Sequence, residues 1–101
     1  MVLERDYQAR LIRKLRRLFP DAIILKNDSS YQQGIPDLSI FHGDRWAMLE
    51  VKPKRPRPGT DDFEPNQEWF IDILDHMSFC SCIYPSNERE VLRDLQRSLA
   101  S

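Results

Sequence analysis

The sequence has no apolar run that approaches the ~20 residues of a membrane span, so we predict no membrane partner. Its N-terminal segment also lacks the apolar core and the small-residue cleavage site of a secretory signal. There are only two cysteines, Cys80 and Cys82, and on a strand they are too close in sequence for a relaxed disulfide. His42 and His76 offer no recognisable spacing for a zinc site. We therefore predict buried free thiols in a reducing compartment.

The composition is that of one globular domain. The chain has 101 residues, of which 41% are hydrophobic and 31% charged, so we expect a single domain over residues 1–101 with one modest core. The formal net charge of −1 conceals an asymmetry, because residues 1–59 carry 12 Lys and Arg against 7 Asp and Glu, whereas residues 60–101 carry 3 against 9. A basic half can face a polyanion, although solvated helix faces explain the same charges.

Apolar periodicity predicts an α/β fold. Residues 3–18 repeat apolar side chains at helical spacing, whereas IPDLSIF (35–41) and WAMLEVK (46–52) alternate like strands. The other expected elements are a strand at 22–26, a helix from Pro65 to Met77 with Trp69, Phe70, Ile73, Leu74 and Met77 as its core stripe, a strand in SFCSCIYP (78–85), and a last helix opened by a capping box of Asn87 and Glu90. This order predicts helices packed against a small mixed sheet.

The predicted hairpin carries charge where a packing element should be apolar. If Gly-Asp (43–44) forms a two-residue loop, Asp37 lies directly opposite Glu50, and Lys52 shares their face. Opposed carboxylates destabilise a sheet unless something positive lies between them, and a divalent metal is the natural candidate. Mg²⁺ or Mn²⁺ bound by Asp37, Glu50 and the backbone carbonyl of Val51 would serve phosphodiester hydrolysis. The alternative is a surface hairpin with scattered charges.

The segments GIPDLSIF and WAMLEVK resemble the core of the PD-(D/E)XK nuclease superfamily. The restriction-endonuclease-like core of that superfamily has the order helix, three strands, helix, strand, which is also the order expected here. More narrowly, the pattern is similar to the VRR-NUC family. It comprises Glu4 followed by Gln8, a polar loop, Gly-Ile-Pro-Asp, a short hairpin, Glu-Val-Lys and Gln67 opening the next helix. The ending SCIYPSNEREVLRDL also fits, so the resemblance covers nearly the whole chain.

The resemblance implies a DNA endonuclease that depends on Mg²⁺ or Mn²⁺ and acts through Asp37, Glu50 and Lys52. It implies Glu4 and Gln67 as supporting site residues, with Glu4 as a further metal ligand. Small stand-alone members are commonly phage or bacterial proteins, which implies the cytoplasm of a bacterium or an infected host. Related members act as dimers on branched DNA such as Holliday junctions. Two alternatives stay open: Glu4 complements the helix dipole, and Gln67 is an exposed first-turn residue.

The stretch after Lys52 carries Lys54, Arg55 and Arg57 among prolines. We expect these three cations to bind DNA phosphates, the alternative being a stiff linker. A homodimer would present two sites to two strands, with Trp46, Trp69 or the apolar face of the last helix in its interface. Other function classes stay open, namely a nucleic-acid-binding module without chemistry or dependent on a partner, and a non-catalytic interaction protein.

Overall fold

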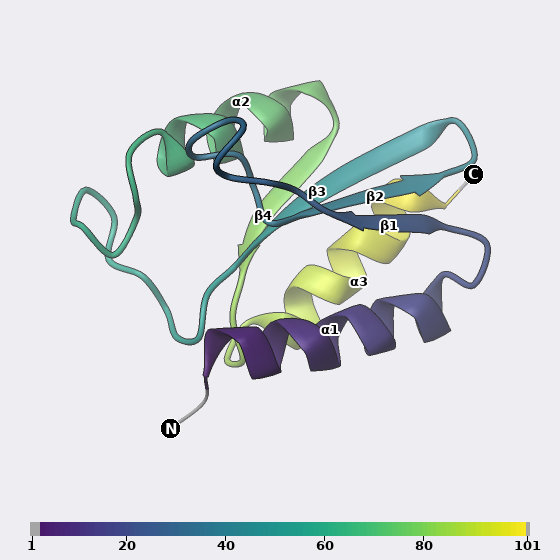
Figure 1. Cartoon of the computed structure of the whole chain (residues 1–101). Helices are drawn as coiled ribbons and strands as arrows, with labels where there is room; N and C mark the ends of the chain where they lie inside the picture. The colour runs from purple at the N-terminus through teal and green to yellow at the C-terminus, as the bar shows by residue number, and fades with distance from the viewer. Residues whose placement is uncertain (1–2, 101) are drawn as a thin grey trace.

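The structure, a computed structural model, describes residues 3–100 and shows an α/β fold of three helices and one four-stranded sheet (Figure 1). The elements in chain order are α1 (Glu4–Leu18), β1 (Ile23–Lys26), β2 (Leu38–His42), β3 (Arg45–Val51), α2 (Gln67–Met77), β4 (Phe79–Ile83) and α3 (Glu88–Leu99). The expected order of helices and strands is confirmed.

The sheet is mixed, as predicted, with the strand order β1-β2-β3-β4. Strands β1, β2 and β3 are successively antiparallel, and β4 lies parallel to β3 after the crossover through α2. The β2–β3 register pairs Leu38 with Leu49 and His42 with Arg45, so Gly43 and Asp44 form the two-residue turn. Gly43 has a φ of 64°, a left-handed conformation that glycine adopts without a steric penalty. The predicted hairpin register is therefore confirmed.

The core lies between one face of the sheet and the helices α1 and α3, which lie side by side below the sheet in Figure 1. Helical spacing gives each of these helices a continuous apolar stripe. The buried residues of the two stripes are Tyr7, Leu11, Ile12 and Leu15 in α1, and Val91, Leu92, Leu95 and Leu99 in α3. The apolar stripe of α3 is buried in the core of its own chain, so it is not available for the dimer interface in which we expected it.

The second helix is less buried than the periodicity of its sequence predicts. Trp69 and Met77, expected in the core stripe, are 61% and 67% exposed, and Gln67 is the buried residue of α2. The reason is its position, since α2 packs against β4 on the opposite face of the sheet from α1 and α3 (Figure 1). Periodicity identifies an amphipathic helix but does not tell how much of its apolar face finds a neighbour.

Two helix starts also differ from the prediction. The second helix begins at Gln67 rather than Pro65, because Asn66 adopts a left-handed conformation with a φ of 72°. At α3 the predicted capping box is wrong, since the Asn87 side chain makes no cap hydrogen bond. Instead its Oδ1 accepts from the backbone N–H of Tyr84, and its Nδ2 donates to the carbonyl of Cys82, which fixes the preceding turn.

Cys80 and Cys82 are free thiols, of which Cys80 is buried and Cys82 partly exposed. Within residues 3–100, no helix is both long enough and apolar enough to cross a membrane.

Candidate active site

Asp37 and Glu50 lie on neighbouring segments of the β2–β3 hairpin, at the end remote from its turn. The register ends with the pair of Leu38 and Leu49, and Asp37 and Glu50 are the next residue on each side of that pair. The backbone N–H of Val51 donates to Oδ2 of Asp37 at 2.8 Å and so holds the Asp37 carboxyl at the end of β3. Burial raises the pKa of Asp37, and the hydrogen bond from Val51 partly opposes this increase. The hairpin thus brings the two predicted ligands together.

Glu50 is the most deeply buried charged residue of this group, with 1% of its surface exposed. Its Oε2 accepts a hydrogen bond from Nε2 of Gln67 at 2.9 Å and lies 3.4 Å from Nζ of Lys52. Its Oε1 is buried and has no hydrogen-bond partner among residues 3–100. Burial, and then the charge of Asp37, raise the pKa of Glu50 from 4.5 to about 8, with Lys52 opposing the increase. Glu50 is therefore a buried acid that lacks a full set of partners.

Lys52 is the cation of the same cluster, and the neutral amide of Gln67 links it to Glu50. Nζ of Lys52 donates to Oε1 of Gln67 at 2.9 Å, and the same oxygen accepts from the backbone N–H of Glu64 at 2.8 Å. The Lys52 ammonium also lies 5.5 Å from the centre of the Phe63 ring, within cation–π range. Gln67 therefore bridges Glu50 and Lys52 and is only 7% exposed, which excludes its interpretation as an exposed first-turn residue.

Glu4, the first residue of α1, lies at the edge of this cluster. Burial raises the pKa of Glu4, the charge of Asp37 adds to the increase, and Lys52 opposes it. Glu4 and Lys52 also line a common cleft of about 220 Å³. Three carboxyl groups thus surround one lysine, an excess of negative charge that a divalent cation would neutralise. A first-turn position also suits the helix dipole, so the two interpretations of Glu4 are compatible.

The predicted DNA-binding cations lie on the loop that borders this cleft. Lys54 and Arg55 line it together with Glu4 and Lys52. Arg57 is instead held by Asp62, to which it donates from Nε at 2.9 Å and from its backbone N–H at 2.9 Å. This pair lowers the pKa of Asp62 to about 2. The loop is therefore folded back on itself at Arg57, while Lys54 and Arg55 stay exposed at the cleft.

The sequence did not reveal two residues that position this site. Asn27 accepts at its Oδ1 from Ser39 and donates through its Nδ2 to the carbonyl of Pro36, while its backbone N–H donates to the carbonyl of Asp37. These bonds hold the chain that carries Asp37. Gly34 has a φ of 90°, and a Cβ there would lie 2.6 Å from Cβ of Asn66.

The close approach at Gly34 lets the polar loop 27–34 pack on the start of α2, which carries Gln67. The glycine before Ile-Pro-Asp was visible in the sequence. Its partner was not, because the two segments are far apart along the chain.

The side chains present fit a divalent metal. Glu50 offers a buried oxygen without a partner, and the backbone engages one oxygen of Asp37, Oδ2. Within residues 3–100, no three His, Cys, Asp or Glu side chains converge into a complete metal cage. Mg²⁺ is commonly held by one or two carboxylates and completes its shell with water and substrate oxygens. Two carboxylates beside Lys52, which lines the cleft, suit that kind of site.

A scan against protein-family models found no match, and searches of curated proteins and of solved structures found none either.

Proposed function

We propose that this protein is a DNA endonuclease that depends on Mg²⁺ or Mn²⁺, with a restriction-endonuclease-like core of the VRR-NUC type. The observation that carries the proposal is the buried Glu50 with its unpartnered Oε1, beside Asp37 and within 3.4 Å of Lys52. Burying a carboxyl group without a full set of partners destabilises a fold, so its position is best explained by a ligand that it binds.

Each residue of the cluster has a distinct role in this proposal. Asp37 and Glu50 would hold the metal, with the Val51 carbonyl and Glu4 as additional oxygen ligands. The metal, when bound, supplies an activated water and neutralises charge that develops on the phosphate. Lys52 would hold a proton beside the attacking water or donate to the transition-state phosphate. Gln67 positions both partners, because it bonds Glu50 through its amide nitrogen and Lys52 through its amide oxygen.

The loop cations would hold the substrate beside these groups. Lys54 and Arg55 line the cleft that Lys52 also lines, so a DNA strand bound there would lie next to the two carboxylates. Arg57 would join them if DNA competes with Asp62 for its guanidinium. A backbone contact of this kind raises affinity for all sequences equally and makes it depend on salt.

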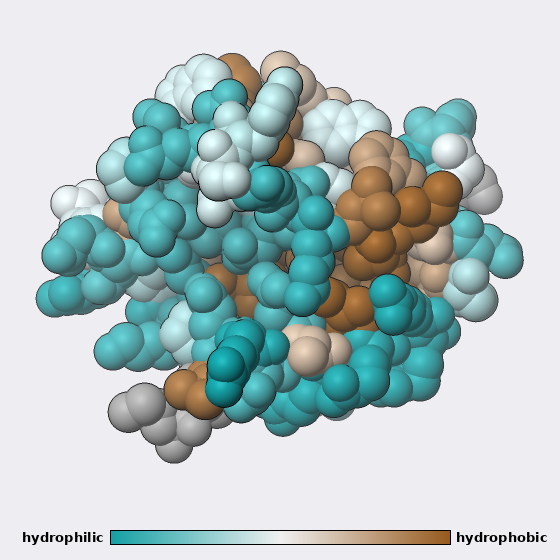
Figure 2. Space-filling model, viewed as in Figure 1, coloured by the Kyte–Doolittle hydropathy of each residue, from teal (hydrophilic) through white to brown (hydrophobic). Residues whose placement is uncertain are grey.

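We also propose a homodimer formed through the β1–β2 part of the sheet face that carries α2, a part that α2, packed on β4, leaves exposed. Ile23, Leu25 and Phe41 are 60%, 49% and 44% exposed, and brown side chains gather over the β1 side of the sheet in Figure 2. Phe41 pairs with Trp46, which shares a strand face with Glu50, so this face is continuous with the site. A second copy docked there would bury apolar surface and bring two sites toward two DNA strands.

The nuclease proposal is tested with labelled linear, flapped and four-way DNA, incubated with the pure protein in Mg²⁺, Mn²⁺ or EDTA. We expect cleavage of at least one substrate with either metal and none in EDTA. The pattern across the panel would also reveal whether branched DNA is preferred. A folded protein that binds these DNAs and cleaves none of them would overturn the proposal in favour of a binding module without chemistry.

A further inference from the structure

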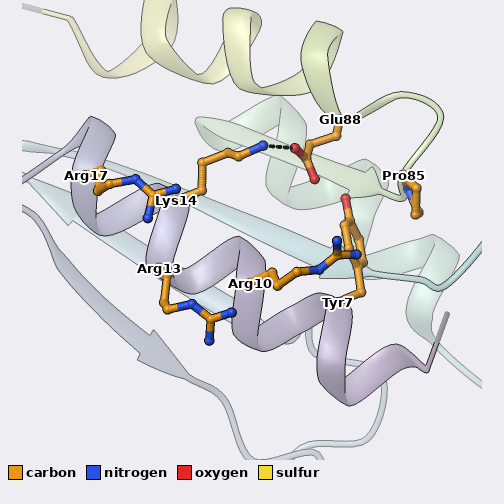
Figure 3. Close-up of a pocket in the computed structure, with 7 residues that line it drawn as sticks. All are labelled: Tyr7, Arg10, Arg13, Lys14, Arg17, Pro85 and Glu88. Carbon is orange, nitrogen blue, oxygen red and sulfur yellow. Dashed lines mark hydrogen bonds and ion pairs between the residues drawn. The ribbon is translucent and has the colours of Figure 1, made fainter.

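A second concave surface lies between α1 and the turn that precedes α3 (Figure 3). This surface, which we call the α1 groove, has a volume of about 370 Å³. It is lined by Tyr7, Arg10, Arg13, Lys14, Arg17, Pro85 and Glu88. Neither the carboxylates Asp37 and Glu50 nor the loop cations Lys54, Arg55 and Arg57 contribute to it.

The charges of the α1 groove are strongly unbalanced, because four cations face one carboxylate. Lys14 makes an ion pair with Glu88, as Figure 3 shows. The three arginines have no ion-pair partner among residues 3–100, although exposed carboxylates are common elsewhere on this chain. The groove therefore keeps three guanidinium groups free for an anion.

Two further features prepare the groove for such a ligand. The guanidinium of Arg10 lies 5.8 Å from the centre of the Tyr7 ring, so a cation–π contact holds it at the edge of the groove. Tyr7 is 2% exposed, and its hydroxyl faces the Glu88 side without a hydrogen-bond partner among residues 3–100. Burial and the nearby Glu88 raise the pKa of Tyr7.

The spacing of the cations favours a polymer over a small anion. Arg10, Arg13 and Arg17 recur at intervals of three and four residues, which places them in a row on one side of α1. At 1.5 Å per residue this row is ~10 Å long, which is longer than a single phosphate group. A single phosphate would engage only one end of it.

The row and the candidate active site share one helix. The helix that carries the row begins at Glu4, which borders that site, and Arg10 follows less than two turns later. At ~100° per residue the row lies on a different side of α1 from Glu4, so a strand that runs from the site to the row passes around the first turns of the helix. We propose that the α1 groove binds the sugar-phosphate backbone of the DNA strand that enters the active site. This inference rests on the proposed function, and it adds a second surface that holds the substrate.

The test compares two double variants that each remove two positive charges. In Arg13→Gln/Arg17→Gln the charges come from the groove. In the matched control Arg16→Gln/Arg97→Gln they come from exposed positions outside it. Binding of labelled duplex DNA is measured by fluorescence anisotropy in EDTA, over a range of salt concentrations.

Each lost phosphate contact should lower the slope of log affinity against log salt by ~0.9. The groove variant should therefore lose ~2 from the slope and bind roughly 10- to 60-fold more weakly at about 0.1 M salt, while the control changes little. Equal slopes for the two variants would overturn the proposal. Polyglutamate, a model for an acidic protein, serves as a second probe. If the groove variant binds DNA as the wild type does but no longer binds polyglutamate, the proposal is also overturned and the groove is a site for an acidic protein.

This measurement is independent of cleavage. If the wild type binds DNA through the groove but cuts none of the substrates, the nuclease function is contradicted, whereas the proposed role of the groove in DNA binding is not. If the wild type and the groove variant cut DNA equally well, the proposed role of the groove in DNA binding is contradicted, whereas the proposed nuclease function is not.

Discussion

Replacing Glu50 by Gln should stabilise the metal-free protein at neutral and alkaline pH. In the folded protein the pKa of Glu50 is about 8, against 4.5 for the ordinary carboxyl group. Between these two values the folded state retains a proton that the unfolded chain has released, so the free energy of unfolding falls as the pH rises. Gln at this position cannot ionise, keeps the shape of the side chain and still accepts from Gln67.

The size of this effect follows from proton linkage. One retained proton lowers the free energy of unfolding by ~1.4 kcal/mol per pH unit, so the rise from about pH 5.5 to about pH 7.5 removes ~3 kcal/mol from the wild type. Glu50→Gln should lose much less over the same interval. Some slope remains, because burial also raises the pKa of Asp37. Against a typical total of 5–15 kcal/mol, the difference is readily measured.

The assay is urea unfolding at several pH values in EDTA, followed by far-UV circular dichroism. Glu90→Gln is the matched control, since it removes an exposed carboxyl group from α3. Parallel pH profiles for the wild type and Glu50→Gln would refute the reasoning, because they would mean that Glu50 ionises normally. Added Mg²⁺ or Mn²⁺ should stabilise the wild type at about pH 7.5 and have little effect on Glu50→Gln.

Three more predictions concern the chemistry, the substrate and the assembly. Lys52→Met should lower the single-turnover cleavage rate more than DNA affinity, since a transition-state contact contributes little in the ground state; lost affinity with an unchanged rate at saturating DNA would make Lys52 a simple phosphate contact. Lys54→Ala/Arg55→Ala should reduce the salt slope of DNA binding by ~2, whereas an unchanged slope would make the loop a linker. Sedimentation equilibrium should show a dimer that Phe41→Glu dissociates; a 12.0 kDa species with and without junction DNA would exclude it.

The sequence predicted the parts of this fold that depend on local patterns. Alternation and a Gly-Asp turn were sufficient for the register of the hairpin, because a two-residue loop fixes which residues face each other. That register alone brought Asp37 to Glu50. Helical spacing likewise predicted the buried stripes of α1 and α3, which both face the same side of the sheet.

What the sequence could not show depends on contacts between distant segments. The exposure of Trp69 follows from where α2 crosses the sheet, and no periodicity within the helix encodes that position. Asn27 and Gly34 act on the site through partners that the fold supplies. The α1 groove is a similar case, since its arginines were visible as charges on a helix, but the turn before α3 is what makes them a concave surface.

The central claim, that Asp37 and Glu50 form the metal centre of a nuclease, is tested most directly by cleavage under single-turnover conditions. Asp37→Asn and Glu50→Gln are compared with the wild type and with Asp44→Asn, which removes a carboxyl group at the opposite end of the same hairpin. With Mg²⁺ present, the two site variants should cut at least ~1,000-fold more slowly, equivalent to ~4 kcal/mol of transition-state stabilisation, and Asp44→Asn should cut at the wild-type rate. Cleavage at the wild-type rate by either folded site variant would contradict the assignment.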